Sequence, residues 1–286
     1  MAQVTTKVSL VNVASAATIQ LGVSALDYIR KQGGGGWGLA PRQNRWTEGA
    51  RGTRFRSTRK GRRTYTIPLA IVGDGRQQIE DRLRALANVV SSPFRIVVTY
   101  STGRTFSVAA YYESGLEGSF GGLVDRFNEA DLVMSCPQPD WTSGDSQTAT
   151  FVKVNGEPLF PNITFQHLTP NTSLGERTLS NAGDVEAPAT WVLKGPIGGG
   201  SEFRNAAGEG FAIADDQTID VGEVITIKNG RVTDATGANR YDLLDLAPYF
   251  FLIAKGSPKV TVAIVDADEN TNVALIWPER REVVYG

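Results

Sequence analysis

The chain has 286 residues, of which 41% are hydrophobic, with 31 glycines, 13 prolines and a formal net charge of −1. This length suits two domains of ordinary size, and the hydrophobic content excludes a chain that is disordered throughout. No run approaches the roughly 20 apolar residues of a membrane helix, and the single cysteine, Cys136, excludes an internal disulfide.

Charge is distributed unevenly along the chain. Residues 1–145 contain 18 Lys and Arg against 12 Asp and Glu, a balance of +6, whereas residues 146–286 contain 11 against 18, a balance of −7. Two halves of opposite sign are compatible with self-association or stacking on partner proteins, but they do not favour it over other arrangements.

The first two segments of the chain differ in kind. Residues 1–22 alternate polar and apolar side chains, which predicts a strand and not a signal peptide. Residues 33–63 begin with four glycines, but a phosphate-binding loop requires Lys-Ser/Thr after its glycines and a helix that starts there. Here Trp37 and Pro41 follow, and the next helix signal starts near residue 76. We therefore expect the glycines to form a flexible loop tip.

The basic part of this stretch predicts a strand or long hairpin with one charged face, because Arg54 and Arg56 alternate with Phe55. Nine Lys and Arg stand against Glu48 alone between residues 42 and 63. Interleaved aromatic residues such as Trp46 leave nucleic-acid contact open as an interpretation. An arm that docks on an acidic neighbour is favoured, a solvated face comes second, and nucleic-acid contact comes third.

The next elements alternate between strand and helix signals. Residues 64–72, 94–100 and 105–112 are β-branched or aromatic runs, and the last two predict a hairpin across a short glycine-containing connection. Between them, residues 76–90 place apolar side chains on one face at helical spacing, with Asp74 as the expected N-cap. The inward stripe consists of Ile79, Leu83, Leu86 and Val90. A single amphipathic helix therefore covers one face of a sheet.

A domain boundary is expected near residues 136–147, where prolines, glycine and small polar residues end a strand-like run. Beyond it the pattern is almost wholly β, with a turn between strands in residues 150–165. Further strand signals follow in residues 189–195, 218–237 and 259–277. Short strands separated by turn signals at regular spacing predict a β-sandwich.

Few residues suggest catalysis or ligand binding. His167 is the only histidine and lacks a Cys or His partner at metal spacing, and Cys136 is expected to be buried at a strand end. Residues 266–272 resemble the opening of a calcium loop but lack its required glycine and glutamate, which favours a turn rich in Asp and Asn. Trp191 and Trp277 lie in apolar strands, where a core role is favoured over sugar stacking. We predict no enzyme activity, cofactor or metal.

Taken in order, these segments resemble the distal tail proteins (Dit) of long-tailed, non-contractile bacteriophages. The similarity covers nearly the whole chain and lies in the order of its segments, with no single diagnostic motif. The first half contributes the glycine-rich loop with Trp37 and Pro41, the arginine-rich segment leading into residues 62–73, the single helix, residues 91–118 and CPQPDW at 136–141. The second half contributes residues 179–199, 225–232 and 248–262.

The resemblance implies a mainly β fold of two β-sandwich domains. Residues 1–145 would form a ring-building (belt) domain with one covering helix and a protruding arm at about 33–63. Residues 146–286 would form a galectin-like sandwich, which does not by itself imply sugar binding.

The resemblance also implies a structural virion protein, made in the host cytoplasm and located at the phage tail tip. Six copies would form a ring that joins the tail tube protein to the hub protein, contacts other baseplate or receptor-binding proteins, and lets DNA pass through its channel. A carbohydrate-binding adhesin is the first alternative and a nucleic-acid-binding module the second. The residues expected at the interface between copies are Trp37, Arg42, Arg45, Trp46, Arg54 and Arg56.

Overall fold

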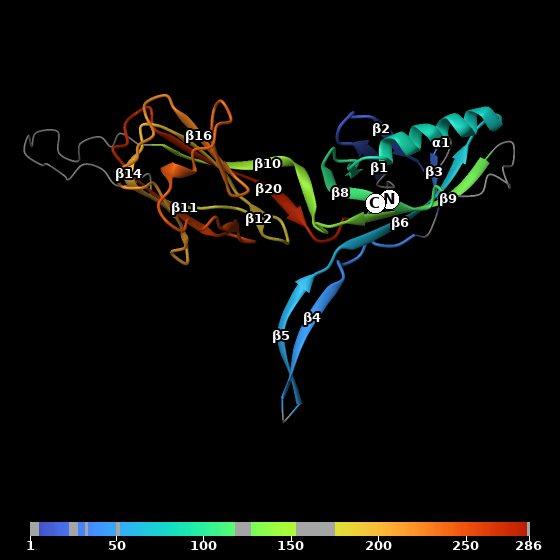
Figure 1. Ribbon diagram of the computed structural model, residues 1–286, viewed down its shortest axis with the longest axis horizontal. Helices are drawn as coiled ribbons and strands as arrows, with labels where there is room; N and C mark the ends of the chain where they lie inside the picture. The colour runs from blue at the N-terminus through green and yellow to red at the C-terminus, as the bar shows by residue number, and fades with distance from the viewer. Residues whose placement is uncertain are drawn as a thin grey trace, which may run out of the picture. The chain divides into compact units, whose positions relative to one another are not determined.

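The computed structural model describes residues 6–22, 28–31, 34–49, 52–117, 127–152 and 175–284. The chain divides into two compact units. The first contains Met1–Asp145 and Arg280–Gly286, and the second contains Ser146–Glu279. The chain passes from one unit to the other within strand β10 (Trp141–Val152) and returns within β20 (Asn272–Arg281) (Figure 1). No pattern in the sequence predicts that the chain returns to the first unit at Arg280.

The first unit is built from antiparallel strands. One series of paired strands runs β10-β8-β7-β1-β2, and a second runs β3-β6-β9-β8. Strand β8 belongs to both, because its first half pairs with β7 and its second half pairs with β9. The strands are β1 (Lys7–Asn12), β2 (Thr18–Leu21), β3 (Tyr28–Arg30), β6 (Arg63–Val72), β7 (Phe94–Thr99), β8 (Thr105–Ser114) and β9 (Phe127–Cys136). The strands predicted at 64–72, 94–100 and 105–112 and the hairpin between the last two are confirmed.

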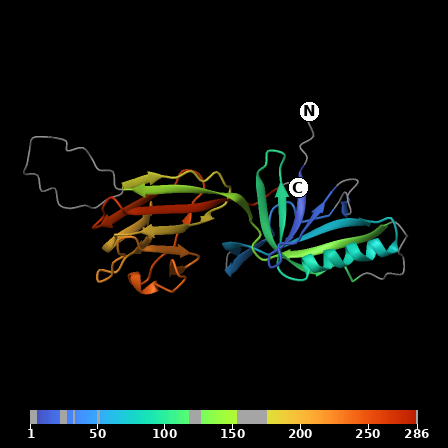
Figure 2. The same cartoon turned by 90° about the horizontal axis from the view of Figure 1, so that it is seen from above.

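Helix α1 (Arg76–Val90) is the only α-helix among the described residues, and its predicted span is confirmed. It packs against β1, β2 and β6 and runs along one side of the first unit (Figure 2). Its buried side chains are Ile79, Leu86, Val89 and Val90, while Leu83 is partly buried. This apolar stripe closes a core that also contains Trp141 and, from the end of the chain, Val284.

The prediction that Asp74 caps this helix is wrong. The N-cap is Gly75, and no side chain makes a capping hydrogen bond there. The Asp74 backbone N–H instead donates to Gln78 Oε1 at 2.7 Å, so the side chain of the first turn reaches back to the preceding backbone. At the other end, the buried Asn12 side chain donates to the Val89 carbonyl at 3.0 Å, which satisfies one of the terminal carbonyls that a helix leaves open.

Strands β4 (Arg42–Gly49) and β5 (Gly52–Lys60) pair only with each other among the described residues. Their hairpin extends away from the other strands of the first unit (Figure 1). The described side chains of this hairpin are exposed as far as Arg59, and Lys60 at its base is partly buried. We call this hairpin, residues 42–60, the arm.

The described residues of the second unit form two main sheets around one core. One sheet has the order β17-β16-β13-β20-β10 and the other β11-β19-β14-β15, with a short pair formed by β12 and β18. The elements are β11 (Gly175–Thr178), β12 (Ala187–Pro188), β13 (Thr190–Lys194), β14 (Gly198–Asn205), β15 (Gly210–Ala212), β16 (Val224–Lys228), β17 (Arg231–Asp234), the 3-10 helix η2 (Tyr241–Leu243), β18 (Leu252–Ile253) and β19 (Lys259–Val265). The chain is thus mainly β.

Two tryptophans that could have stacked on sugars belong to the core of the second unit. Trp191 is 2% exposed and Trp277 is 3% exposed. The Trp191 ring meets Phe203 edge-on at 5.4 Å and Phe211 edge-on at 5.6 Å, a geometry that aromatic pairs favour. The predicted core role of both tryptophans is confirmed. The turn predicted in residues 150–165 lies largely outside the described residues, and His167 lies wholly outside them.

Candidate interaction site: the arm and its anchor

The glycines before the arm do not form a flexible loop tip, so that prediction is wrong for the described glycines 34–36. Gly35 pairs with the edge of β6, donating its N–H to the Thr66 carbonyl at 3.1 Å and accepting the Thr66 N–H at 3.2 Å. Gly34 and Gly36 have φ values of 84° and 95°, and an added Cβ at either would lie 2.2 Å from a carbonyl oxygen of β6. Glycine is required here because the backbone itself is packed against a strand.

We predict that Gly36→Ala lowers the free energy of unfolding of the first unit by about 1–3 kcal/mol, because it combines an unfavourable φ with a backbone clash. Gly38→Ala is the matched control, since an added Cβ there meets nothing within 4 Å. Denaturant unfolding of the two variants measures the difference. Equal effects of the two substitutions would show that the close approach to β6 is unimportant.

Trp37, one of the expected interface residues, packs inside its own unit. Its half-buried ring stacks on Trp141 at 6.0 Å with an interplanar angle of 15°, and it meets Tyr65 edge-on at 5.2 Å. The Arg30 guanidinium lies 5.8 Å from the Trp37 ring centroid. Trp37 therefore joins the glycine segment to the core at the base of the arm.

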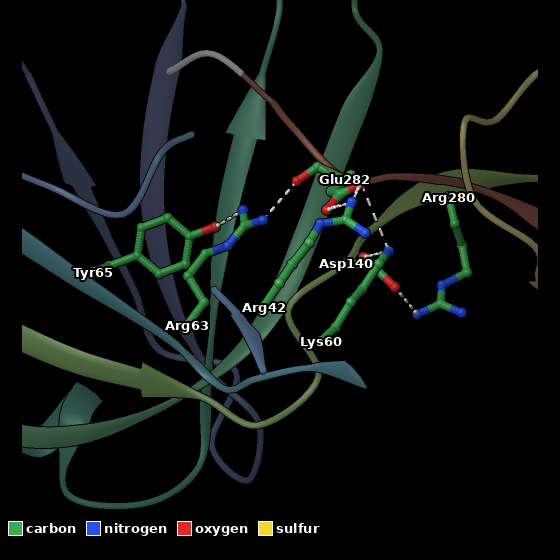
Figure 3. A network of polar contacts seen from close by, with 7 residues as sticks. All are labelled: Arg42, Lys60, Arg63, Tyr65, Asp140, Arg280 and Glu282. Atoms are coloured by element: carbon green, nitrogen blue, oxygen red, sulfur yellow. Dashed lines mark hydrogen bonds and ion pairs between the residues drawn. The ribbon is translucent and has the colours of Figure 1, made fainter. Parts of the chain in front are cut away.

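The two ends of the arm are held by ion pairs to segments far away in the sequence (Figure 3). Arg42 Nη2 lies 3.1 Å and 3.2 Å from the two carboxylate oxygens of Glu282. Lys60, its cross-strand partner, donates to Asp140 Oδ1 at 2.8 Å, and Arg280 donates to Asp140 Oδ2 at 3.0 Å. The Asp140 side chain is only 8% exposed, so solvent screens its two pairs less than it screens surface pairs.

A buried arginine joins this network to the core. Arg63 is 1% exposed, and it donates to Tyr65 Oη and to the Glu282 backbone carbonyl, each at 2.8 Å. We call Arg42, Lys60, Arg63, Asp140, Arg280 and Glu282 the anchor. Of these residues, only Arg42 was among the predicted site residues, and it was predicted to contact another copy of the chain. No local pattern pairs it with Glu282, which lies 240 residues away.

The same buried arginine adjoins two groups that do not ionise easily. Burial raises the pKa of Tyr65 to about 12, and the hydrogen bond from Arg63 opposes this rise. Burial also raises the pKa of the Cys136 thiol to about 12, again opposed by the charge of Arg63. Cys136 is the last residue of β9 and is buried, as predicted.

We predict that Cys136 does not react with a thiol-specific disulfide reagent at about pH 8 in the folded protein, because the attacking species is the thiolate. Because burial raises this pKa from 9.0 to about 12, the stability of the fold is at its full value below about pH 9. Stability then falls as the pH rises toward 12, since the thiol ionises more readily in the unfolded chain. The measurement is thiol labelling with and without denaturant, and rapid labelling of the folded chain would contradict the expected burial.

One face of the arm is aromatic. Trp46 and Phe55 are cross-strand partners whose rings meet edge-on at 5.4 Å. Trp46 is 59% exposed and Phe55 is 55% exposed. Trp46 was an expected interface residue, and it lies where a large apolar side chain is available to a partner. An exposed Trp with a second aromatic residue beside it is typical of a residue that contributes strongly to a protein–protein interface.

The opposite face of the arm is basic. Cross-strand pairing places Arg45 with Ser57, Thr47 with Arg54, and Gln43 with Arg59 on this side. Arg56 is the extra residue at a register irregularity, and its Nε donates to Thr47 Oγ1 at 2.8 Å, on the same side. Among the described residues, no carboxylate lies within ion-pair distance of these four guanidinium groups. The basic face therefore consists of Arg45, Arg54, Arg56 and Arg59.

The described part of the chain offers little for other chemistry. It contains no group of three or more His, Cys, Asp or Glu side chains that could hold a metal ion, and no helix long and apolar enough to cross a membrane. In residues 266–272, the segment that resembles the opening of a calcium loop, Asp268 Oδ1 accepts the backbone N–H of Asn270 at 2.7 Å and that of Thr271 at 3.2 Å. These bonds are those of an Asx turn.

No protein-family model matches the chain, and no curated protein matches it. Solved structures of phage baseplate components share its fold. The crystal structure of SPP1 Dit, presented as a paradigm of the hub adsorption apparatus in phages infecting Gram-positive hosts, matches with a TM-score of 0.62 and 12% identity. The match covers 88% of this chain and 93% of that chain. The resemblance to distal tail proteins is thus confirmed at the level of the fold.

Two structures of the phage p2 baseplate in its activated conformation, one with Ca and one with Sr, also match. Each has a TM-score of 0.53 and 12% identity, over 98% of this chain and 100% of that chain. The similarity therefore includes both compact units.

Proposed function

We propose that this chain is a structural protein of a phage tail tip, a distal tail protein that assembles into a ring. The observation that carries the proposal is the match to SPP1 Dit over 88% of the chain. The arm supports it independently, because a two-stranded hairpin is marginally stable alone in water. Its exposed Trp46 and Phe55 and its basic face suit contact with a neighbouring subunit.

In this proposal six copies close into a ring between the tail tube protein and the hub protein of the tail tip. Other baseplate or receptor-binding proteins attach to the ring, and DNA passes through its centre. The protein is made in the host cytoplasm and acts in the virion. Its role is mechanical and connective, and no reaction is assigned to it.

The proposal gives the two parts of the chain different roles. The N-terminal domain, expected over residues 1–145, builds the ring and carries the arm, while the C-terminal domain is a galectin-like sandwich turned toward host attachment. The support for the second assignment is the pair of sheets around the Trp191 core. The burial of Trp191 and Trp277 removes the two tryptophans considered for sugar stacking, so the adhesin alternative gains no support from them.

The test is the mass of the full-length chain in solution together with electron microscopy of the same sample. Closed particles with a central hole and the mass of six copies are the expected result. The sample is also added to isolated tail tubes, because some tail proteins assemble only on a partner. A chain that stays monomeric under both conditions would contradict the proposal.

A further inference from the structure

Residues 280–284 belong to the first unit, although the whole second unit separates them in sequence from residues 1–145. We call these five residues the latch. Val284 is 1% exposed and lies in the core of the first unit, and the Arg281 guanidinium lies 5.1 Å from the centroid of the buried Phe106 ring. The first unit is therefore complete only when the latch is in place.

The latch also supplies contacts that hold the base of the arm. Both carboxylate oxygens of Glu282 accept hydrogen bonds from Arg42, and the Glu282 backbone carbonyl accepts one from the buried Arg63 (Figure 3). Arg280 donates to one oxygen of Asp140, whose other oxygen accepts from the last residue of the arm. Without the latch, Arg42 loses this carboxylate and Arg63 loses an acceptor. The second loss is costly, because a buried charged donor is left short of a partner.

The second unit fixes the position of the latch. Strand β20 pairs with β13 inside the second unit, where Leu275 lies opposite Trp191, and it continues without a break into Arg280 and Arg281. Its side chains alternate between buried and partly buried positions, and a shift of one residue would move every side chain to the other face. The register of β20 in the second unit therefore decides where Arg280 and Glu282 fall.

We propose that the latch makes the order of the arm depend on the folding of the second unit. While the second unit is folded, β20 delivers the latch to the base of the arm in one register. When the second unit unfolds, residues 146–279 become one long flexible connection, and closing it costs entropy. A two-stranded hairpin has little stability of its own, so the arm loses its order at the same point. A chain whose second unit is not folded thus carries a disordered arm.

The first experiment follows hydrogen exchange of the full-length chain as urea rises, in the arm, in α1 and in the second unit. Trp191→Ala removes a 2% exposed ring from the core of the second unit, which is expected to lower the urea midpoint of that unit. The arm amides are expected to lose protection at this lowered midpoint, while α1 keeps its protection. Arm amides that stay protected until α1 unfolds, or a loss of protection everywhere in one step, would overturn the proposal.

The second experiment tests the latch by exchanging its charges. Glu282→Lys and Arg42→Glu are each expected to speed exchange of the arm amides about tenfold, with α1 and the second unit unchanged. The double variant restores an ion pair with its signs reversed, and its arm exchange is expected to return to within about threefold of that of the natural chain. Glu176→Lys is the matched control, because Glu176 forms an exposed ion pair with Lys259 at 2.7 Å within the second unit.

Two results of this second experiment would contradict the latch. One is an equal effect of Glu282→Lys and Glu176→Lys on the arm, and the other is a double variant whose arm exchanges as fast as in the single variants. The measurements are made at a protein concentration where the chain is a single copy, so contacts between copies do not protect the arm. The latch is therefore tested independently of the proposed ring, and the failure of one leaves the other standing.

Discussion

Replacing residues 44–58 of the arm by an Asn-Gly turn is expected to abolish assembly while both units stay folded. The variant keeps Arg42 and Lys60, so the anchor to Asp140 and Glu282 is preserved. It removes Trp46, Phe55 and the basic face, except for Arg59 at its base. Asn-Gly is the preferred two-residue connection between paired strands, which keeps the shortened hairpin unstrained.

The expected loss is at least about a thousandfold in association, or roughly 4 kcal/mol, because the removed side chains are of the types that dominate interface energies. The measurement is analytical ultracentrifugation over a range of protein concentrations, with thermal unfolding to confirm that the stability of both units is unchanged. Trp46→Ala with Phe55→Ala tests the aromatic face alone. A shortened-arm variant that assembles as readily as the natural chain would show that the arm is no interface.

Trp141→Ala is expected to lower the stability of the first unit by about 3–5 kcal/mol, the usual cost of removing a large buried side chain. Trp141 is 0% exposed, and its ring contacts Trp37 at 6.0 Å and Tyr65 at 5.8 Å. The substitution leaves a cavity beneath the glycine segment and the first residues of β6. The readout is hydrogen exchange, in which the amides of β6 and β9 are expected to lose protection.

Trp46→Ala is the matched control for this variant, because it makes the same chemical change at a site that is 59% exposed. Its expected effect on stability is below about 0.5 kcal/mol, as for most surface substitutions, and its effect falls on association between copies. Trp141→Ala is thus expected to lower stability, whereas Trp46→Ala is expected to weaken association. A large loss of protection in β6 from Trp46→Ala would mean that the arm stabilises its own unit.

Local patterns predicted the elements of this protein well where a single period or turn signal dominates. The apolar spacing from Ile79 to Val90 predicted α1, and the alternation around Phe55 predicted a hairpin strand. The Asp74 cap failed because helix ends depend on one or two residues of backbone geometry, and here the chain begins the helix at Gly75 without a side-chain cap.

The arm was identified from the sequence, but the glycine segment before it was assigned incorrectly. Glycines are compatible both with flexibility and with close backbone packing, and composition does not distinguish the two. Only the pairing of Gly35 with Thr66 showed that this segment lies along a strand. Trp37 was placed with the arm because it is near it in sequence, whereas its ring packs on Trp141.

By itself, the sequence determined the mainly β class, helix α1, a basic hairpin and the opposite charges of the two halves. These properties are local or additive, so periodicity and composition carry them. The tertiary structure alone decided which charges are used inside the unit and which remain for a partner. Arg42 and Lys60 reach Glu282 and Asp140 because the end of the chain returns to the first unit, and such contacts depend on the whole fold. The same fold leaves Arg45, Arg54 and Arg56 together on one open face of the arm.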